Sequence, residues 1–195
     1  MNMLVYGSRE FGQVVRELLR VTEHHFCGYI DDMHCGEEVL GTWDQCRTRF
    51  SPADTAVAVA VGYQDLPGRW DVFERVRNAG YDCPSIIHPS CIIATTAVIG
   101  DGCLIMAGAI VDARAQLDQL VVAWPGVIVN HDSIVERNSF LSPGATVCGS
   151  SRVKSNTFLG AGAIVTDHVT VPSGSFIKAG SVFSRRSASE RRTGS

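Results

Sequence analysis

The sequence predicts a small α/β domain followed by an all-β parallel β-helix, and two observations carry that prediction. From Ile93 to Ile177 an aliphatic residue occurs at every sixth position without an insertion. Before this stretch, short apolar runs alternate with helical patterns. A strict repeat of this length is typical of a solenoid, in which each repeat packs only on its neighbours. We therefore expect an α/β domain at 1–87, a β-helix at 88–182 and a disordered tail at 183–195.

The α/β domain is predicted from the alternation of buried strands with helical patterns. Strands are expected at 4–6, 26–30, 56–61 and 85–87. One helix is expected over 14–19, after the loop that ends at Gly12, and another over 70–79. This order indicates a small parallel sheet of the Rossmann-like kind, whose ligands bind beyond the carboxyl ends of the strands. Five candidate substrate-binding residues fall at those ends: Gly7, Ser8, Asp31, Asp32 and Gly62.

The glycine loop after the first strand is a weak signal. Gly7 and Gly12 keep the outer positions of a G-x-x-x-x-G loop, but Arg9 and Glu10 stand between them. A dinucleotide fingerprint needs a glycine in the middle for close approach to a pyrophosphate. With about half the length of a doubly wound fold, the domain is expected to hold a mononucleotide, or else the loop only packs. A carboxylate in the turn at 31–32 is placed to accept hydrogen bonds from a ribose or a base, unless this is an ordinary solvated turn.

The β-helix is predicted from two interleaved ladders. Four residues after each aliphatic residue lies a small or slender one that lets the chain turn at a corner. Three six-residue faces make one coil of eighteen residues, so the repeat spans roughly five coils. Families with this period wind left-handed, an exception to the usual crossover rule. The aliphatic ladder consists of Ile93, Ile99, Ile105, Val111, Leu117, Ala123, Val129, Val135, Leu141, Val147, Val153, Leu159, Val165, Val171 and Ile177.

His131 is the residue of the repeat that packing does not explain. It is expected on the outer surface of a coil, and the residue one coil later, at 131 plus 18, is Gly149. A glycine beside an imidazole presents a backbone N–H that no side chain obstructs. Acyl transfer needs a base that removes the proton of the nucleophile and a donor that stabilises the oxyanion. An isolated surface histidine is the alternative.

Composition excludes several classes of protein. The chain has 195 residues, 45% hydrophobic content and a net charge of −3, so there is no electrostatic footprint for nucleic acid. Its seven cysteines contain no C-x-x-C pair, and neither a disulfide frame nor a zinc site is indicated. No apolar run approaches the roughly 20 residues of a membrane span. We expect a cytoplasmic protein with reduced cysteines.

Together the two halves resemble a known family. The resemblance rests on an ordered set of segments: Val5-Tyr6-Gly7, Gly28-Tyr29-Ile30-Asp31-Asp32, Val39-Leu40-Gly41, Val59-Ala60-Val61-Gly62, Ile86-Ile87-His88-Pro89-Ser90 and Val129-Asn130-His131-Asp132. In these segments the chain is similar to the NeuD/PglD-like acetyltransferases, hexapeptide-repeat enzymes that act on nucleotide-linked amino sugars or on sialic acid.

The resemblance implies an assembly and a set of roles. It implies a homotrimer with acetyl-coenzyme A in the groove between neighbouring β-helices and the sugar nucleotide held by the N-terminal domain. His131 then matches the general base, Asp132 the acidic residue that orients it, and Gly149 the oxyanion donor. Gly149, Ala161 and Ala179 are the implied coenzyme contacts.

The chain departs from the family pattern at three places. Members often carry Gly and His where Glu10 and Phe11 stand, and many carry a second His in place of Phe140. The usual Gly-Val-Pro-Ala near the end of the repeat is Ala-Gly-Ser-Val at 179–182. Trp124 near the implied groove is also unusual, and is expected either to pack at a subunit contact or to form a wall of an altered acceptor pocket.

The predicted function is transfer of an acetyl group from acetyl-coenzyme A to the amine of a nucleotide-linked aminodeoxy sugar for surface glycan synthesis, with no metal. One alternative is O-acetylation of sialic acid, because the same histidine would activate a hydroxyl group. A second is zinc-dependent hydration, which needs three imidazoles, whereas the repeat contains only His131 and His168. A third is a non-catalytic sugar-nucleotide binding protein. The sequence does not distinguish the acceptor group, the nucleotide, the sugar or the acyl group.

Overall fold

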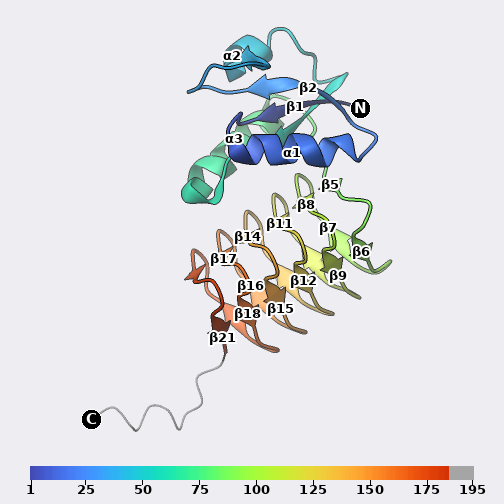
Figure 1. Cartoon of the computed structure of the whole chain (residues 1–195), viewed down its shortest axis with the longest axis vertical. Coiled ribbons are helices and arrows are strands. Elements are labelled where there is room, and N and C mark those ends of the chain that lie inside the picture. The colour runs from blue at the N-terminus through green and yellow to red at the C-terminus, as the bar shows by residue number, and fades with distance from the viewer. Residues whose placement is uncertain (185–195) are drawn as a thin grey trace, which may run out of the picture.

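The computed structural model describes residues 1–184 and shows an α/β domain seated on one face of a parallel β-helix (Figure 1). The fold class predicted from the sequence is confirmed. The tail expected at 183–195 lies, from residue 185 onwards, outside the described residues, and the last strand extends to Phe183. Within residues 1–184, no helix is both long and apolar enough to cross a membrane.

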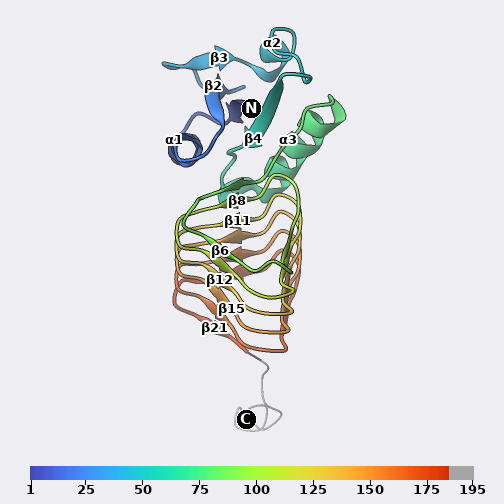
Figure 2. The same cartoon turned by 90° about the vertical axis from the view of Figure 1, so that its right-hand side faces the viewer.

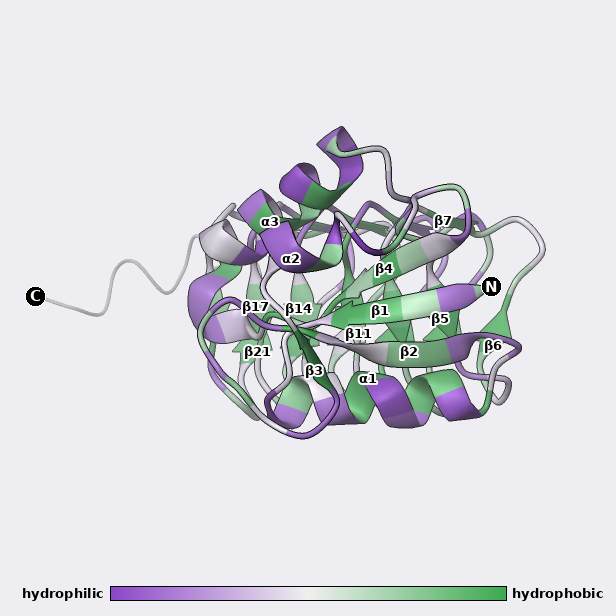
Figure 3. Cartoon of the chain, turned by 90° about the horizontal axis from the view of Figure 1, so that it is seen from above, coloured by the Kyte–Doolittle hydropathy of each residue, from purple (hydrophilic) through white to green (hydrophobic). Residues whose placement is uncertain are grey.

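The α/β domain is built on a four-stranded parallel sheet with the strand order β3-β2-β1-β4. Its strands are β1 (Asn2–Tyr6), β2 (His25–Ile30), β3 (Val39–Gly41) and β4 (Thr55–Val59). Strands buried on both faces are continuous apolar runs, and Figure 3 shows β1 as largely hydrophobic beyond its first residue. Because all four strands are parallel, their carboxyl ends meet at one edge, where the candidate substrate residues follow β1, β2 and β4.

The helices cover the two faces of this sheet. Helix α1 (Glu10–Arg20) follows β1, and α3 (Leu66–Asn78) follows β4 through a 3-10 turn, η1 (Tyr63–Asp65). The short α2 (Trp43–Cys46) begins at a capping box. Neither β3 nor α2 is predicted by the sequence patterns, because elements of three or four residues are shorter than the periods that reveal them.

The β-helix consists of three parallel sheets, one for each face of the prism (Figure 2). The domain face lies under the α/β domain and contains β5 (Ile86–Ile87), β8 (Leu104–Ile105), β11 (Val122–Ala123), β14 (Phe140–Leu141), β17 (Phe158–Leu159) and β20 (Phe176–Ile177). The aliphatic face contains β6 (Ile92–Ile93), β9 (Ile110–Val111), β12 (Ile128–Val129), β15 (Thr146–Val147), β18 (Ile164–Val165) and β21 (Val182–Phe183). The third face contains β7 (Val98–Ile99), β10 (Gln116–Leu117), β13 (Ile134–Val135), β16 (Arg152–Val153) and β19 (Thr170–Val171).

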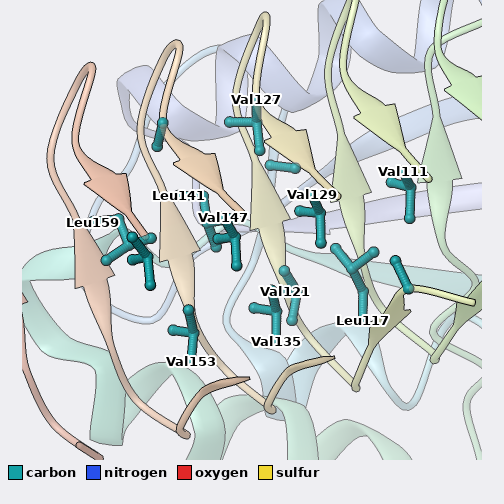
Figure 4. Close-up of a cluster of buried hydrophobic side chains, with 14 of the residues drawn as sticks. Val111, Leu117, Val121, Val127, Val129, Val135, Leu141, Val147, Val153 and Leu159 are labelled. Atoms are coloured by element: carbon teal, nitrogen blue, oxygen red, sulfur yellow. The ribbon is translucent and has the colours of Figure 1, made fainter. Parts of the chain in front are cut away.

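The aliphatic ladder fills the prism as the sequence predicts. Val129, Val135, Leu141 and Val147 are all 0% exposed and stack on the same positions of the adjacent coils (Figure 4). Each strand pairs in register with the strand eighteen residues away, as Val129 does with Val147. Burial of one such side chain is worth roughly 1.5–3 kcal/mol relative to exposure. The prism is therefore a rigid scaffold, and any function depends on what projects from its corners and faces.

One strand belongs to a different domain from the one expected. The strand predicted at 85–87 forms as β5, but it pairs with β8 of the β-helix and not with the α/β sheet. Ile87 packs against the interior of the prism, while Ile86 packs with the core of the α/β domain. The ladder therefore begins one step earlier than Ile93, because the six-residue spacing continues back to Ile87.

A buried arginine fixes the α/β domain on the prism. Arg69 of α3 is 0% exposed and donates hydrogen bonds from Nη1 to the carbonyl of Leu120 and to Oδ1 of Asn138, both at 2.7 Å. Asn138 in turn donates from Nδ2 to the carbonyl of Leu66, also at 2.7 Å. Burial lowers the pKa of Arg69 to about 9. These contacts hold the carboxyl edge of the sheet in a defined position above the domain face.

Candidate active site

His131 lies at the corner that follows β12, where the aliphatic face turns into the third face. Its side chain is 55% exposed. Its carbonyl accepts a hydrogen bond from the Ser150 N–H at 3.0 Å, which fixes this corner on the next coil. The imidazole is thus held on the outside of the prism by backbone pairing, as the spacing predicts.

Gly149 packs directly against the His131 ring, as the eighteen-residue spacing predicts. A β-carbon at Gly149 would lie 2.7 Å from both Cε1 and Nε2 of the imidazole. Carbon atoms do not approach that closely, so a residue with a side chain would displace the ring. The carbonyl of Gly149 accepts a hydrogen bond from the His168 N–H, whereas its own N–H has no partner within residues 1–184.

Asp132 orients the imidazole. Its Oδ2 lies 2.9 Å from Nδ1 of His131. A carboxylate accepts at this distance, so Nδ1 carries the proton and Nε2 keeps the lone pair that a base requires. The hydrogen bonds from Arg114 and then from His131 hold the pKa of Asp132 well below its usual range. The carboxylate is therefore ionised throughout the neutral range.

Arg114 is the functional candidate that the sequence reasoning missed. It stands one coil before Asp132 and donates from Nε to Oδ1 at 2.6 Å and from Nη2 to Oδ2 at 2.8 Å. Arg114 and Asp132 are eighteen residues apart, the same spacing that places Gly149 beside His131. The repeat could therefore have predicted that Arg114 and Asp132 are neighbours.

The three coenzyme candidates lie at two different corners. Gly149 follows β15, where the aliphatic face turns into the third face, whereas Ala161 and Ala179 follow β17 and β20, where the domain face turns into the aliphatic face. The latter two stack, because the Gly180 N–H donates to the carbonyl of Ala161 at 2.8 Å. Within one chain the whole aliphatic face separates Gly149 from the other two.

At the carboxyl edge of the α/β sheet, Asp31 accepts hydrogen bonds from its own turn and from the loop after β1. Its Oδ2 accepts from the N–H of Ser8 at 3.0 Å and from the Ser8 hydroxyl at 2.6 Å. Its Oδ1 accepts from the N–H groups of Met33 and His34 and lies 3.1 Å from Nδ1 of His34. Burial alone would raise the pKa of Asp31, but these hydrogen bonds outweigh it and hold the pKa well below its usual range. Asp31 thus organises the loops.

Asp32 is also engaged within the chain. Its Oδ2 accepts from the hydroxyl of Tyr6 and from Nη1 of Arg75, the latter at 3.2 Å, and its Oδ1 accepts from the N–H of Trp43 at 2.7 Å. Burial and the bond to Asp32 raise the pKa of Tyr6 above its ordinary value. The two carboxylates therefore fix the ends of β1 and β2.

Beside these loops lies a cavity of about 610 Å³. Its lining includes Ser8, Arg9, Gln13, Arg16, Tyr29 and His34. Of the five residues expected from the sequence, only Ser8 lines it. Gly7 supports the loop, because a β-carbon there would lie 2.7 Å from the carbonyl oxygen of Ala60 and its φ is +111°. Gly62 has no atom within 4 Å of such a β-carbon and lies outside this lining.

Two of the departures from the family pattern contact each other. Phe11 of α1 and Phe140 of β14 meet with their ring centroids 5.7 Å apart, and Trp124 stacks on Phe11 at the same distance. Tyr63 continues the cluster at 5.4 Å from Phe140. Phe140 is 4% exposed, so the aromatic cluster joins the two domains of one chain. Trp124 packs here against its own N-terminal domain.

Within residues 1–184, no three His, Cys, Asp or Glu side chains lie close enough together to hold a metal ion.

No family model matches the sequence. Among solved structures, the acetyltransferase domain of PglB from Neisseria gonorrhoeae is 30% identical, with a TM-score of 0.85 over 93% of this chain and 90% of that one. The same domain in complex with acetyl coenzyme A is 27% identical, with a TM-score of 0.82 over 94% and 93%. A histidine variant of perosamine N-acetyltransferase from Caulobacter crescentus, in complex with CoA and GDP-perosamine, is 25% identical, with a TM-score of 0.85 over 93% and 88%.

The likeness to the PglB domain covers both domains of the chain and nearly all of that protein. The corner at His131, with its carboxylate and its glycine, gives the chain the groups that acyl transfer uses. The protein is an acyltransferase and belongs to the hexapeptide-repeat β-helix enzymes of the NeuD/PglD type.

Proposed function

We propose that the protein transfers the acetyl group of acetyl-coenzyme A to the amine of a nucleotide-linked amino sugar for surface glycan synthesis. The observation that carries this proposal is the corner at His131, where Asp132 engages Nδ1 at 2.9 Å and Gly149 leaves room for the ring. The similar Caulobacter protein is an N-acetyltransferase in complex with CoA and GDP-perosamine, which supports a nucleotide-linked amino sugar as acceptor.

In the proposed mechanism, His131 is the general base. The amine nitrogen of the acceptor attacks the thioester carbonyl, and Nε2 of His131 takes the proton that the nitrogen loses. The imidazolium that forms stays hydrogen-bonded to Asp132, which is ionised. The N–H of Gly149 donates to the oxyanion of the tetrahedral intermediate. Collapse of the intermediate expels the thiolate of coenzyme A and leaves the acetylated sugar.

We further propose that the active site is completed in a homotrimer. The outward side chains of the aliphatic face form a row that is apolar except for Thr146: Ile92, Ile110, Ile128, Thr146, Ile164 and Val182. Ile92 and Val182 are 65% and 61% exposed in the single chain. A second copy seated on this face buries the row and forms one wall of the groove at His131. This arrangement also accounts for Ala161 and Ala179, which in the trimer contribute to the groove of a neighbouring copy.

The nucleotide is assigned to the cavity beside α1. Arg9 precedes the first turn of α1, where unpaired N–H groups favour a phosphate, and it lines the cavity together with Ser8 and His34. Ser8 and His34 are held in place by Asp31. Arg9 supplies positive charge, and the hydroxyl and imidazole supply hydrogen bonds to a ribose or base.

The proposal is tested by incubating the protein with acetyl-coenzyme A and a panel of UDP-, dTDP- and GDP-linked amino sugars. We expect one acceptor to gain a single acetyl group by mass spectrometry while free thiol is released in equal amount. The matching hydroxy sugars and free sialic acid are the controls. Transfer only to sialic acid would refute the amine assignment, and thiol release without any acetylated sugar would refute the acceptor class.

A further inference from the structure

Arg114 forms a two-point contact with the carboxylate that faces His131. Its guanidinium donates from Nε and Nη2 to the two oxygens of Asp132 at 2.6 and 2.8 Å, a fork geometry that fixes the plane of the carboxylate. The Arg114 N–H is itself anchored on the Thr96 hydroxyl at 3.1 Å. The arginine therefore reaches across one coil from a backbone position that is anchored through its N–H.

The carboxylate needs such support. Asp132 has a φ of +59°, in the left-handed region, and its side chain is 38% exposed. A single hydrogen bond to His131 leaves the torsion of an exposed aspartate free to rotate, and its carboxylate free to bind water instead. With the guanidinium in place, Oδ2 lies 2.8 Å from Arg114 Nη2 and 2.9 Å from His131 Nδ1.

We propose that Arg114 is a positioning residue for the reaction: it holds the Asp132 carboxylate in the orientation that fixes the His131 tautomer. The proposal rests on the proposed function, in which His131 is the base. An exposed ion pair contributes little to stability, so the role of Arg114 lies in the geometry of the corner. The charged groups beside Asp132 include Arg114 and Asp112. Two coils further along, Asp167 stands in the column of His131 and His168 in the column of Asp132.

The test compares Arg114→Gln and Arg114→Lys with the parent. The matched control is Arg152→Gln, because Arg152 forms an exposed pair of the same kind with Glu136 at 2.8 Å on the third face. We expect Arg114→Gln to lower kcat by about ten-fold with both KM values nearly unchanged. We expect the kcat of Arg114→Lys to lie between those of Arg114→Gln and the parent, since an ammonium keeps the positive charge but not the two-point contact with the carboxylate. Arg152→Gln should match the parent.

Two measurements separate positioning from a general structural role. The acid limb of the kcat/KM profile should move to higher pH in Arg114→Gln, because the Asp132 carboxylate then acts on His131 without its guanidinium partner. In a double-mutant cycle, Arg114→Gln should lower kcat little further once Asp132→Asn is present. Both changes disrupt the same contacts, from Arg114 through Asp132 to His131. Additive losses, or an unmoved acid limb, would overturn the proposal.

Two other outcomes would also refute a positioning role for Arg114. A raised KM with unchanged kcat would make Arg114 a substrate-binding group, and loss of assembly by light scattering would make it an interface residue. Nitrogen-15 NMR of His131 gives a readout that needs no substrate: we expect the Nδ1–H form in the parent and a mixture of tautomers in Arg114→Gln. If no acceptor is acetylated, the proposed function fails, while the NMR comparison still decides the role of Arg114.

Discussion

At the scale of single residues, the proposed base lies where its replacement should cost the fold least. His131 contributes nothing to the buried ladder, and its side chain is 55% exposed. Its neighbours hold the ring in place: Asp132 accepts a hydrogen bond from Nδ1, and Gly149 leaves the space that the ring occupies. We therefore expect mutations at this corner to change activity without changing stability.

Replacing the base is the first test of this separation. We expect His131→Ala to lower kcat by about 10²–10⁴-fold at neutral pH, the usual contribution of general-base catalysis. The melting temperature should stay close to that of the parent, because no core cavity forms. Steady-state kinetics and thermal unfolding check the two halves of the prediction. Ordinary turnover by the alanine variant would mean that the substrate amine reaches the thioester already deprotonated.

Gly149→Ala tests the space beside the ring. The new β-carbon would lie 2.7 Å from Nε2 of His131, and the exposed ring can rotate away at small cost in stability. We expect kcat to fall by about 100-fold, since a displacement of the order of 1 Å in a catalytic group has such effects. The backbone N–H is kept in this variant, so the loss would report the ring and not the oxyanion donor. A crystal structure of the variant with an unmoved imidazole would contradict this explanation.

At the scale of elements, two loops at the carboxyl edge of the sheet depend on one carboxylate. The loop after β1 is tied to Asp31 through Ser8, and the turn after β2 is tied to it through Met33 and His34. A residue that accepts bonds from both segments gives them one common geometry. The shape of the cavity that both loops line is thereby fixed, as the proposed nucleotide site requires.

Asp31→Ala should affect the binding of the two proposed ligands differently. We expect it to weaken binding of the sugar nucleotide by about ten-fold or more while leaving acetyl-coenzyme A binding nearly intact, because the loops lie in the N-terminal domain. Loss of the hydrogen bonds should also cost about 1–3 kcal/mol of stability. Calorimetric titration with each ligand is the measurement. Equal loss of both affinities would mean that the substitution unfolds the domain.

The same variant makes a prediction about pH. The folded pKa of Asp31 lies below its usual value, so its stabilising contribution is present above the usual pKa and is lost as pH falls through the folded pKa. The difference in free energy of unfolding between parent and Asp31→Ala should be full at neutral pH and should shrink below about pH 4. A difference that stays constant down to pH 2 would contradict the assignment of this carboxylate.

At the scale of the whole molecule, the proposed trimer would account both for the aliphatic face and for the separation of the coenzyme candidates. Ala161 and Gly149 lie at opposite corners of the aliphatic face, so one chain does not bring them to a common groove. Closed cyclic assembly brings one corner of each copy to the other corner of its neighbour. The aliphatic row then becomes an interface.

Ile128→Lys tests the assembly. Ile128 is outward on β12, three residues before His131, and in the proposed trimer a lysine there would be buried unpaired in the interface. We expect light scattering to give a trimer for the parent and smaller species for the variant, with parental circular dichroism and greatly reduced turnover. Val21→Lys is the control, since Val21 is an exposed aliphatic residue on the α/β domain. A parent that stays monomeric at micromolar concentration would refute the trimer.

The pairing of His131 with Gly149 was predictable because the repeat has no insertion. Without insertions, the residue number alone gives the place of a residue on the coil. The same period predicted the buried ladder, and the alternation of apolar runs predicted the parallel sheet. The contacts of Asp31 were not predictable, because whether a carboxylate faces a ligand or its own backbone depends on torsions that no periodicity encodes. The Arg114 contact was encoded in the spacing, but two charged residues one coil apart become a pair only if both point outward at the same corner.

The sequence by itself determined the prism, its register and the placement of His131 beside Gly149, because each follows from local periodicity and from stacking of adjacent coils. Only the tertiary structure decided how the α/β domain is seated on the prism. Arg69, Asn138 and the rings of Phe11 and Phe140 come from segments far apart in the chain, and no repeat relates them. Their contacts form only when the two domains dock. A sequence pattern therefore identifies these residues but does not predict that they contact one another.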